Sequence, residues 1–529
     1  MHSIILKLKN NTCNYIEYDK NKHKSFNDIY YDVVSMYELF KKQGIEQGDR
    51  VGLLCKNCYE YLVVDLACIL GGYIMVAFHQ NDNFMKSEKL FTQYNLKLLI
   101  VDEVYENSIE QKNKILYLDQ VKDWLNTNTV NIQSNSIESS PFMAEDLFTI
   151  VFTSGSTGRS KGLAVKYKCP EEFVHTCIDK FKLCDTDKVL LFLPMSQFSS
   201  RCYVYAAILI GFNLAVVKPD ELLWGLRKYK PTTFQAVPFV FEQIGETLKN
   251  KINNSMKLHV LYKLFLMIKK ILPTNIKRKI QKKLFRNIYE LFGGNIRLMI
   301  TGAAPVSPYL LETFCDIGLT IYEGYGLVES GMIALNYPGN NRIGSVGKIL
   351  ENKRVKLDQD GQILVSSQYL WGDSYIDANE EDNKRVFLSD GWIATGDIGY
   401  FDEDEFLYIT GRMKDVIIMS TGLKINPLTI EKELYALDLI RQAIVFGDNM
   451  PGLVAVIVPK DNSVTNELLQ NEVRKVNASL PKDYRVNDFI ISDIAFTVEN
   501  GMMTSNIKMN RKEIFNRFKN QINACGNLS

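Results

Sequence analysis

The sequence predicts an α/β protein with a large N-terminal domain of mostly parallel sheets flanked by helices, followed by a small α/β C-terminal domain. Three observations predict it. At 529 residues the chain is too long for one hydrophobic core. Short apolar runs typical of strands alternate with helical stretches over most of the chain, which favours parallel sheets covered by helices. After Gly396 the pattern changes to short, charged, turn-rich segments, and a compact α/β pattern follows.

The predicted elements follow in chain order. The strand-like runs of the large domain are DRVGLLCK, KLLIVDE, DLFTIVFTS, KVLLFLP, NLAVVK, TTFQAVP, IRLMITG and LTIYEGYG. The apolar run that begins at Cys55 indicates a helix and then a strand, and the longest apolar stretch, from Cys202 to Val217, indicates the same order. That stretch is short for a membrane span of roughly 20 residues. The C-terminal pattern predicts a helix (PLTIEKELYAL) and two strands (QAIVFGD and LVAVIVP).

Composition excludes several classes of function. The formal net charge is +1, so the molecule as a whole offers no electrostatic argument for binding nucleic acid. Ten cysteines are scattered without a disulfide framework, and the N-terminus lacks the ordered regions of a signal peptide. Cys55 and Cys58 form a lone CxxC, and the five histidines are not spaced to share a metal. We therefore expect a cytoplasmic protein with no zinc site.

The segment TSGSTGRSKG at residues 153–162 directly follows a predicted buried strand. Glycines let a backbone approach phosphate oxygens closely, hydroxyls and amides donate hydrogen bonds to them, and a lysine adds a point charge. The spacing is not that of a Walker A loop, because Gly158 and Lys161 are three positions apart. The alternative is a flexible Gly/Ser turn. The candidate phosphate ligands are Thr153, Ser154, Gly155, Ser156, Thr157, Gly158 and Lys161.

This decapeptide resembles the phosphate-loop signature of the adenylate-forming superfamily, which comprises acyl-CoA synthetases, luciferases and carrier-loading adenylation domains. Later segments resemble its other signatures in the same order. They are GAAP at 302–305, YEGYGLVE at 322–329, WIATGD at 392–397, GRMKD at 411–415 and NGMMTSNIKMNR at 500–511. Each alone has a bland explanation as a turn or as packing, but six in order over most of the chain indicate one enzyme family.

The resemblance implies roles for individual residues. In the nucleotide site the backbone of Gly302, Ala303 and Ala304 would border adenine, Tyr325 would stack on it, and Glu323, Gly324 and Gly326 belong to the same signature. Glu329 would hold Mg²⁺ and Asp397 would bind the ribose hydroxyls, tasks for which carboxylates are suited. Arg412 would lie on the ribose or phosphate side. Thr153, Glu329 and Lys508 are the expected catalytic residues, and Lys508 would bridge the acyl carboxylate and the α-phosphate.

The resemblance also implies a fold and a reaction. It divides the chain into an AMP-binding domain at 1–411 that includes a smaller β subdomain, a hinge at 412–415 that pivots at Lys414, and a mobile domain at 416–529. The expected reaction uses ATP and Mg²⁺ to convert a carboxylic acid into acyl-AMP and pyrophosphate. The small domain would then rotate and bring the region of Gly422 to a tunnel through which CoA attacks, although a simple turn explains that glycine equally well.

Several residues depart from the family pattern. Val328 stands where a Thr or Ser hydroxyl is usual, Gln197 where a His is usual, and Ile418 where many relatives carry Lys. The phrases RLMITGAAPVSP and FTVENGMMTSNIKMNR most resemble long-chain fatty acid–CoA ligases, which favours a medium- or long-chain fatty acid as substrate. Two alternatives stay open: an acyl- or aryl-AMP ligase that loads the phosphopantetheine arm of a carrier protein, and a degenerate member that only senses its ligand.

Residues 257–286 form a strongly basic segment. It holds ten Lys/Arg, no acidic residue and many apolar residues, and Pro273 divides it into two predicted amphipathic helices. One interpretation is a peripheral contact with a membrane surface where a lipid acid enters. The other is a helical hairpin that packs its apolar face on the body and leaves a solvated basic face. The sequence leaves both open.

Overall fold

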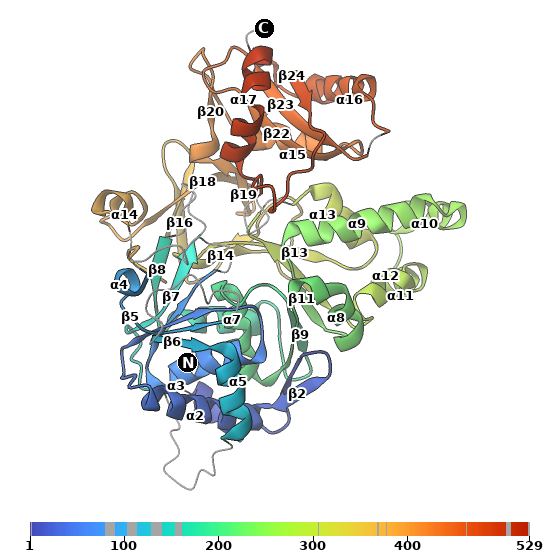
Figure 1. Ribbon diagram of the computed structural model, residues 1–529. Helices are drawn as coiled ribbons and strands as arrows, with labels where there is room; N and C mark the ends of the chain where they lie inside the picture. Colours follow the sequence, from blue (N-terminus) through green and yellow to red (C-terminus); the bar gives the residue numbers. More distant parts are fainter. Residues whose placement is uncertain are drawn as a thin grey trace.

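The structure is a computed structural model, and it describes residues 1, 3–79, 90–102, 114–128, 140–153, 161–304, 306–367, 370–376, 378–461, 463–503 and 509–526. Its described residues form the predicted α/β architecture, with a large unit of two sheets, a four-stranded β unit beside them, and a small α/β unit at the C-terminus (Figure 1).

The first large sheet leads to the phosphate-loop motif. Its strands, in spatial order, are β6 (Ile115–Tyr117), β5 (Leu96–Val101), β3 (Arg50–Leu54), β4 (Ile74–Ala77), β7 (Leu147–Thr153) and β8 (Lys161–Lys166). All neighbours are parallel except the β7–β8 pair. The apolar runs predicted to be strands are strands here, because both faces of this sheet are buried.

The second sheet carries the motifs GAAP and YEGYGLVE. Its spatial order is β15 (Lys348–Ile349), β14 (Gly331–Leu335), β13 (Ile321–Leu327), β12 (Leu298–Gly302), β11 (Thr233–Gln235), β9 (Lys188–Leu191), β10 (Asn213–Val216), β1 (Tyr15–Tyr18) and β2 (Lys22–Ser25). The strands from β13 to β1 run parallel, and antiparallel pairs close both edges. Ligands of such sheets bind outside the carboxyl ends of the parallel strands, and the motif GAAP begins at the carboxyl end of β12.

Helices cover both sheets. They are α1 (Ile4–Asn10), α2 (Phe26–Lys42), α3 (Tyr59–Gly71), α4 (Leu90–Tyr94), α5 (Leu118–Thr127), α6 (Cys169–Asp179), α7 (Phe198–Ala206), a π-helical turn (Ala207–Gly211), α8 (Leu222–Tyr229), α9 (Pro238–Asn253), α10 (Met256–Ile268), α11 (Thr274–Leu284), α12 (Arg286–Leu291), α13 (Pro308–Asp316) and α14 (Glu380–Val386). The helix-then-strand order predicted after Cys55 and after Cys202 is confirmed as α3–β4 and α7–β10.

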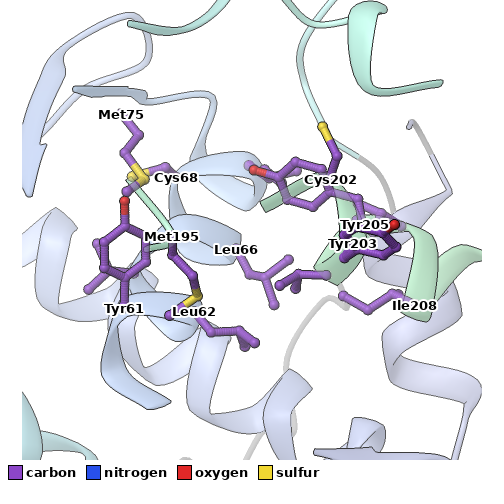
Figure 2. Packing of buried hydrophobic residues seen from close by; sticks show 14 of the residues in the cluster. Tyr61, Leu62, Leu66, Cys68, Met75, Met195, Cys202, Tyr203, Tyr205 and Ile208 are labelled. Atoms are coloured by element: carbon purple, nitrogen blue, oxygen red, sulfur yellow. The ribbon is translucent and has the colours of Figure 1, made fainter. Parts of the chain in front are cut away.

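The main core packs α3 against α7. Figure 2 shows Leu62 and Leu66 of α3 in the same buried cluster as Tyr203 and Tyr205 of α7. A buried ion pair crosses this core, with Arg201 Nε 3.1 Å from Asp65 Oδ2, and the same guanidinium donates to Thr149 Oγ1 of β7 at 2.8 Å. A buried charge is tolerated only when it is paired and hydrogen-bonded. This network therefore fixes β7, the strand that leads to the phosphate-loop motif.

The remaining elements form the smaller units. The four-stranded antiparallel sheet consists of β16 (Lys353–Leu357), β17 (Gln362–Ser367), β18 (Ile393–Phe401) and β19 (Leu407–Arg412). A 3-10 turn (Met413–Asp415) leads to β20 (Ile417–Ile418), β21 (Lys424–Ile425), α15 (Pro427–Tyr435), β22 (Ile440–Phe446), β23 (Leu453–Pro459), α16 (Asn466–Ser479), β24 (Val486–Ile491) and α17 (Arg511–Gly526). The predicted C-terminal helix and strands correspond to α15, β22 and β23.

The C-terminal unit contacts the large unit through charged side chains. Lys460 Nζ lies 2.9 Å from Glu246 Oε1 of α9, and Lys424 Nζ lies 3.5 Å from Asp360 Oδ1 in the turn between β16 and β17. Both pairs are partly exposed, so each contributes little stability, about 0–1 kcal/mol. These two pairs by themselves would therefore hardly oppose movement between the units.

The basic segment forms two helices, α10 and α11, separated near Pro273 as predicted. The prediction of ordinary amphipathic helices is wrong for α10. One of its faces packs against the body, but the exposed face is also largely apolar.

Candidate active site

The phosphate-loop motif connects two paired strands. Thr153 ends β7 and Lys161 begins β8, and the two residues lie opposite each other in the β7–β8 ladder. The motif is therefore the connection of a hairpin whose first strand belongs to the parallel sheet. The predicted ligands within that connection, Ser154, Gly155, Ser156, Thr157 and Gly158, lie outside the described residues.

A tyrosine that the motifs did not single out links the phosphate-loop lysine to the predicted magnesium ligand. Lys161 Nζ lies 5.3 Å from the centre of the Tyr375 ring, and it also pairs with Asp382 Oδ2 at 3.3 Å. The Tyr375 hydroxyl donates to Glu329 Oε1. Tyr375 is brought there by backbone pairing, because it forms an isolated bridge with Leu163 of β8. Two motifs that are distant in the sequence thus share one buried contact residue.

Glu329 lies two residues after the end of β13 and its side chain is buried. Burial raises the pKa of its carboxyl, while the Tyr375 hydrogen bond and the Arg412 charge act in the opposite direction. Among the described residues no group of three or more His, Cys, Asp or Glu side chains could hold a metal ion. Mg²⁺ at phosphate sites commonly takes one or two carboxylates and completes its shell with phosphates and water. A single buried carboxylate fits that pattern.

A buried lysine supports the turn that carries Glu329. Lys353 Nζ donates to the carbonyl oxygen of Ser330 at 2.7 Å and lies 2.8 Å from Glu172 Oε2. The Trp371 indole nitrogen donates to the same Glu172 oxygen at 2.9 Å. Burial lowers the pKa of Lys353, and the Glu172 charge offsets part of that shift. Neither Lys353 nor Glu172 belongs to a motif, and only the structure shows their role in holding this turn.

Three of the predicted nucleotide ligands contact one another. The Tyr325 hydroxyl donates to Asp397 Oδ2 at 2.7 Å, and Arg412 Nε lies 2.9 Å from Asp397 Oδ1. Asp397 and Arg412 face each other in the β18–β19 ladder, so pairing of these strands sets their register. Asp397 is buried, whereas Arg412 is partly exposed. The arrangement joins an aromatic ring, a carboxylate and a guanidinium, groups suited to a purine, to ribose hydroxyls and to phosphate respectively.

Close backbone packing explains the glycine at the end of β12. A Cβ atom at Gly302 would lie 2.6 Å from the carbonyl oxygen of Gly324 on the paired strand β13. Ala303 then adopts a left-handed backbone conformation, with φ of 69°, which is uncommon for a residue with a Cβ. The chain turns sharply there into Ala304, at the carboxyl edge of the sheet. Gly326 is also close to backbone, because its Cβ would lie 2.6 Å from the carbonyl oxygen of Gly331.

Glu323 faces the C-terminal unit. Its carboxyl is buried, and burial raises its pKa to about 8, partly offset by the charge of Lys432 in α15 and by the Val306 backbone N–H. Burial has the opposite effect on a lysine and lowers the pKa of Lys432, while the charge of Glu323 raises it. Lys432 carries no motif signal. The pair brings a residue of the YEGYGLVE motif and a residue of the C-terminal unit to the same boundary.

The remaining predicted residues follow β19 in the chain. Gly422 is in the turn between β20 and β21 with φ of 82°, and a Cβ there would meet no atom within 4 Å. Lys414 is exposed in the 3-10 turn that follows β19. Lys508 lies outside the described residues.

A histidine connects the phosphate-loop strand to the segment that leads into α7. His79 Nδ1 lies 2.8 Å from Ser196 Oγ, and Nε2 lies 3.1 Å from the carbonyl oxygen of Phe152, the residue before Thr153. The neighbouring residue Gln197 is the N-cap of α7. The sequence did not predict this contact, because a lone histidine outside the six motifs matches no functional pattern.

A narrow, mostly apolar cavity lies at the carboxyl ends of β9 and β11. Its lining includes Leu193, Ser200, Tyr203 and Gln235. The hydroxyls of Ser200 and Tyr203 are buried and have no hydrogen-bond partner within the part of the chain that the structure describes. Unpaired buried hydroxyls are costly, which favours a polar group at this position when a ligand is bound.

Comparisons with known proteins identify the family of this chain. The chain matches the family described as AMP-binding enzyme over residues 8–370 and the AMP-binding enzyme C-terminal domain over residues 414–526. It is 27% identical to a protein of Mycobacterium bovis named long-chain-fatty-acid–CoA ligase FadD15, over 92% of this chain and 89% of that protein.

Two solved structures have the same fold. ATP-bound MatB from Rhodopseudomonas palustris superimposes with a TM-score of 0.77 at 19% identity, covering 99% of this chain and 100% of that one. O-succinylbenzoate CoA synthetase (MenE) from Bacillus subtilis, in complex with ATP and magnesium ion, gives a TM-score of 0.73 at 19% identity, with 93% and 96% covered. The family predicted from the six motifs is confirmed, and the chain belongs to the AMP-binding enzymes.

Proposed function

We propose that this protein activates a medium- or long-chain fatty acid with ATP to give acyl-AMP and pyrophosphate, and then transfers the acyl group to CoA with release of AMP. The observation that carries the proposal is the contact of Tyr325, Asp397 and Arg412 in one place, a short distance along the same motif from the buried carboxylate of Glu329. Family membership supports the adenylating reaction, and the name of the M. bovis relative supports the fatty acid.

The first half-reaction is a meeting of two anions. A carboxylate oxygen of the acid attacks the α-phosphorus, the bond to pyrophosphate breaks, and no proton moves. The protein therefore needs to position the partners and neutralise charge rather than supply a base. Lys161 and Arg412 are two cations of the motifs that the structure describes, and we assign Lys508 as the cation that bridges the carboxylate and the α-phosphate.

Magnesium fits the turn after β13. Glu329 would hold it, and the bound ion would neutralise charge on the phosphates. Tyr375 orients the Glu329 carboxylate, and Lys353 holds the carbonyl of the next residue, Ser330. The chain's own contribution is a carboxylate held in a fixed direction before the nucleotide arrives.

The second half-reaction needs the thiol of CoA. Its sulfur attacks the acyl carbon, the bond to AMP breaks, and the thiol proton passes to solvent. We propose domains at 1–411 and 416–529 with a hinge at 412–415, where Lys414 would absorb the backbone change and Gly422 would approach the thiol arm. The partly exposed ion pairs Lys460–Glu246 and Lys424–Asp360 support a contact between the units that can separate.

The acid is assigned to the cavity between α7 and the ends of β9 and β11. Its apolar lining supports an alkyl chain, and its present width admits little more than a water molecule, so side chains must move to admit the acid. Tyr203→Phe is expected to change the preference among acids while leaving the KM for ATP unchanged, and an equal effect on every acid would argue against this assignment.

The proposed acceptor of the acyl group, CoA, has one defined alternative. A carrier-protein phosphopantetheine arm would use the same nucleotide residues as CoA. The deciding experiment measures acid-dependent AMP release with CoA, with a phosphopantetheinylated carrier, and with neither. Release that requires free CoA supports the ligase, whereas release that requires only the carrier moves the assignment to a carrier-loading enzyme.

The described chain contains no helix that is both long and apolar enough to cross a membrane. We further propose a peripheral membrane contact through residues 257–286.

A further inference from the structure

Helix α10 packs one apolar face against the body. Leu258 and Tyr262 are partly buried against the second hydrophobic cluster, and Phe265 is fully buried. The Tyr262 ring meets the Phe285 ring edge to face, with 5.7 Å between their centres. The spacing of these α10 residues, four and then three positions, places them on one side of a helix. The attachment of α10 to the body therefore uses a normal apolar stripe.

The opposite face of α10 is also apolar, but it is exposed. We define the α10 stripe as Met256, Val260, Leu264 and Met267. Its members are between 52% and 82% exposed, and Leu261 beside them is 40% exposed. At about 100° per residue, these positions lie on the side of the helix opposite Leu258, Tyr262 and Phe265. Ile271, just beyond the helix, extends the same exposed surface.

The position of α10 makes the stripe accessible. Figure 1 shows α9 and α10 running away from the large unit as one arm, with α11 and α12 beside it. An ion pair between Lys269 Nζ and Asp316 Oδ1 of α13 anchors the far end of α10. Contiguous exposed apolar surface of this kind usually marks an interaction site.

The charge around the stripe selects the partner. Residues 257–286 contain ten Lys/Arg and no acidic residue, while the whole chain has a formal net charge of +1, so the rest of the molecule is net negative. On α11 the exposed cations include Arg278, Lys279, Lys282 and Lys283. An apolar stripe on a helix that contacts a second helix with exposed cations, on a molecule that is otherwise acidic, matches an anionic lipid surface, into which the apolar face inserts while the cations contact headgroups.

We propose that α10 and α11 form a docking surface for anionic lipid membranes, with the α10 stripe inserted below the headgroups and the α11 cations on them. Only the biological role of this surface depends on the proposed function: it would bring the enzyme to the membrane, in which fatty acids dissolve. The physical claim concerns lipid binding and stands without the reaction.

The test measures binding of the full chain to vesicles in the absence of ATP and acid. Wild type is expected to float with phosphatidylcholine vesicles that contain phosphatidylserine at low salt, and to bind pure phosphatidylcholine at least about tenfold more weakly. The triple change Val260→Gln, Leu264→Gln and Met267→Gln is expected to weaken binding by about tenfold or more, because it removes the inserted apolar surface. Replacing Lys279, Lys282 and Lys283 by Glu is expected to abolish binding at low salt.

Two matched controls separate these effects from general damage. Leu468→Gln removes an equally exposed leucine, 47% exposed on α16 of the C-terminal unit, and is expected to leave binding unchanged. Replacing the same three lysines by Arg keeps the charge and is expected to retain binding. ATP–pyrophosphate exchange with acid supplied in detergent micelles is measured in parallel and is expected to be equal in all variants.

The outcomes are distinct. If wild type does not bind anionic vesicles at low salt, or if the α10 stripe variant binds as wild type does, the docking proposal is overturned, and the exchange assay still reports on the enzyme. If wild type self-associates on sedimentation, the stripe variant is monomeric and neither binds vesicles, the surface serves a second copy of the chain and the lipid proposal is overturned. Loss of exchange in wild type with intact vesicle binding would overturn the proposed function alone.

Discussion

The proposed nucleotide site and the arm formed by α9 and α10 place opposite kinds of side chain where they are costly. In the site, charged groups such as Asp397 and Glu329 are buried, and each is hydrogen-bonded to a tyrosine. On the arm, Leu264 and Met267 are large apolar side chains left in solvent. A buried charge that is satisfied by neighbours is already arranged for a ligand, whereas an exposed apolar face still lacks the surface that would cover it.

This difference predicts how the two regions respond to substitution. Changes in the site should act on the adenylation reaction and, where a partner loses its charge, on stability. Changes on the arm should act on surface binding and leave the chemistry intact.

The largest expected effect is at Glu329. We expect Glu329→Gln to lower the rate of ATP–pyrophosphate exchange by about 10²–10³, because it removes the carboxylate assigned to the cation at the phosphates. Glu351→Gln changes an exposed glutamate and is the matched control. An exchange rate within twofold of wild type at saturating Mg²⁺ would remove Glu329 from the site.

The next effect concerns the pH dependence of stability at Glu323. A carboxyl whose pKa is raised on folding contributes stability that is complete below its unfolded value and is lost as pH rises through its folded value, here about 8. The free energy of unfolding of wild type should therefore fall by about 4 kcal/mol between pH 5 and pH 9. Lys432 reduces this loss because its charge favours the ionised carboxylate.

Glu323→Gln should flatten that profile, since the amide does not titrate. The measurement is urea denaturation at several pH values between 5 and 9 for both proteins. Parallel profiles would show that Glu323 titrates normally and that burial does not control its charge.

A smaller effect is expected at Tyr375. Tyr375→Phe keeps the ring beside Lys161 but removes the hydrogen bond to Glu329. A hydrogen bond to a charged group is worth about 1.5–3 kcal/mol, so exchange should slow by about tenfold or more, with an increased requirement for Mg²⁺. Tyr408→Phe, at a tyrosine that bonds Asp402 elsewhere, is the control. An unchanged Mg²⁺ dependence would contradict the orienting role of Tyr375.

The smallest effect is expected on the arm. The α10 stripe variant should show exchange within about twofold of wild type when the acid is dissolved in detergent, because exposed surface positions rarely change stability by more than about 0.5 kcal/mol. A large loss of exchange in detergent would mean that the arm contributes to the active site, and the contrast between the two regions would fail.

Sequence patterns predicted the parts of the molecule that local chemistry determines. The alternation of apolar runs predicted the parallel strands, and glycine-rich motifs predicted the strand ends, because Gly302 is required where two backbones meet at β12 and β13. The roles predicted for Thr153, Lys508 and the other motif residues, and the domain limits, stay predictions.

Long-range contacts could not be predicted in the same way. Tyr375 reaches Glu329 because its backbone pairs with Leu163 of β8. Lys353 begins β16, and from there its side chain reaches Ser330 and Glu172. Single tyrosines and lysines carry no pattern of their own. The arm shows the same limit, because composition predicted two helices but the packing of Phe265 decided which apolar face of α10 is exposed.

The most direct test of the central claim is ATP–pyrophosphate exchange with purified protein and a panel of short-chain, medium-chain, long-chain and aromatic acids and amino acids. The account predicts exchange with medium- or long-chain fatty acids, loss of that exchange in Lys508→Ala, and AMP release that requires CoA. Absence of exchange with every acid, in wild type and after Val328→Thr restores the family's hydroxyl, would contradict it and indicate a protein that binds its ligand without activating it.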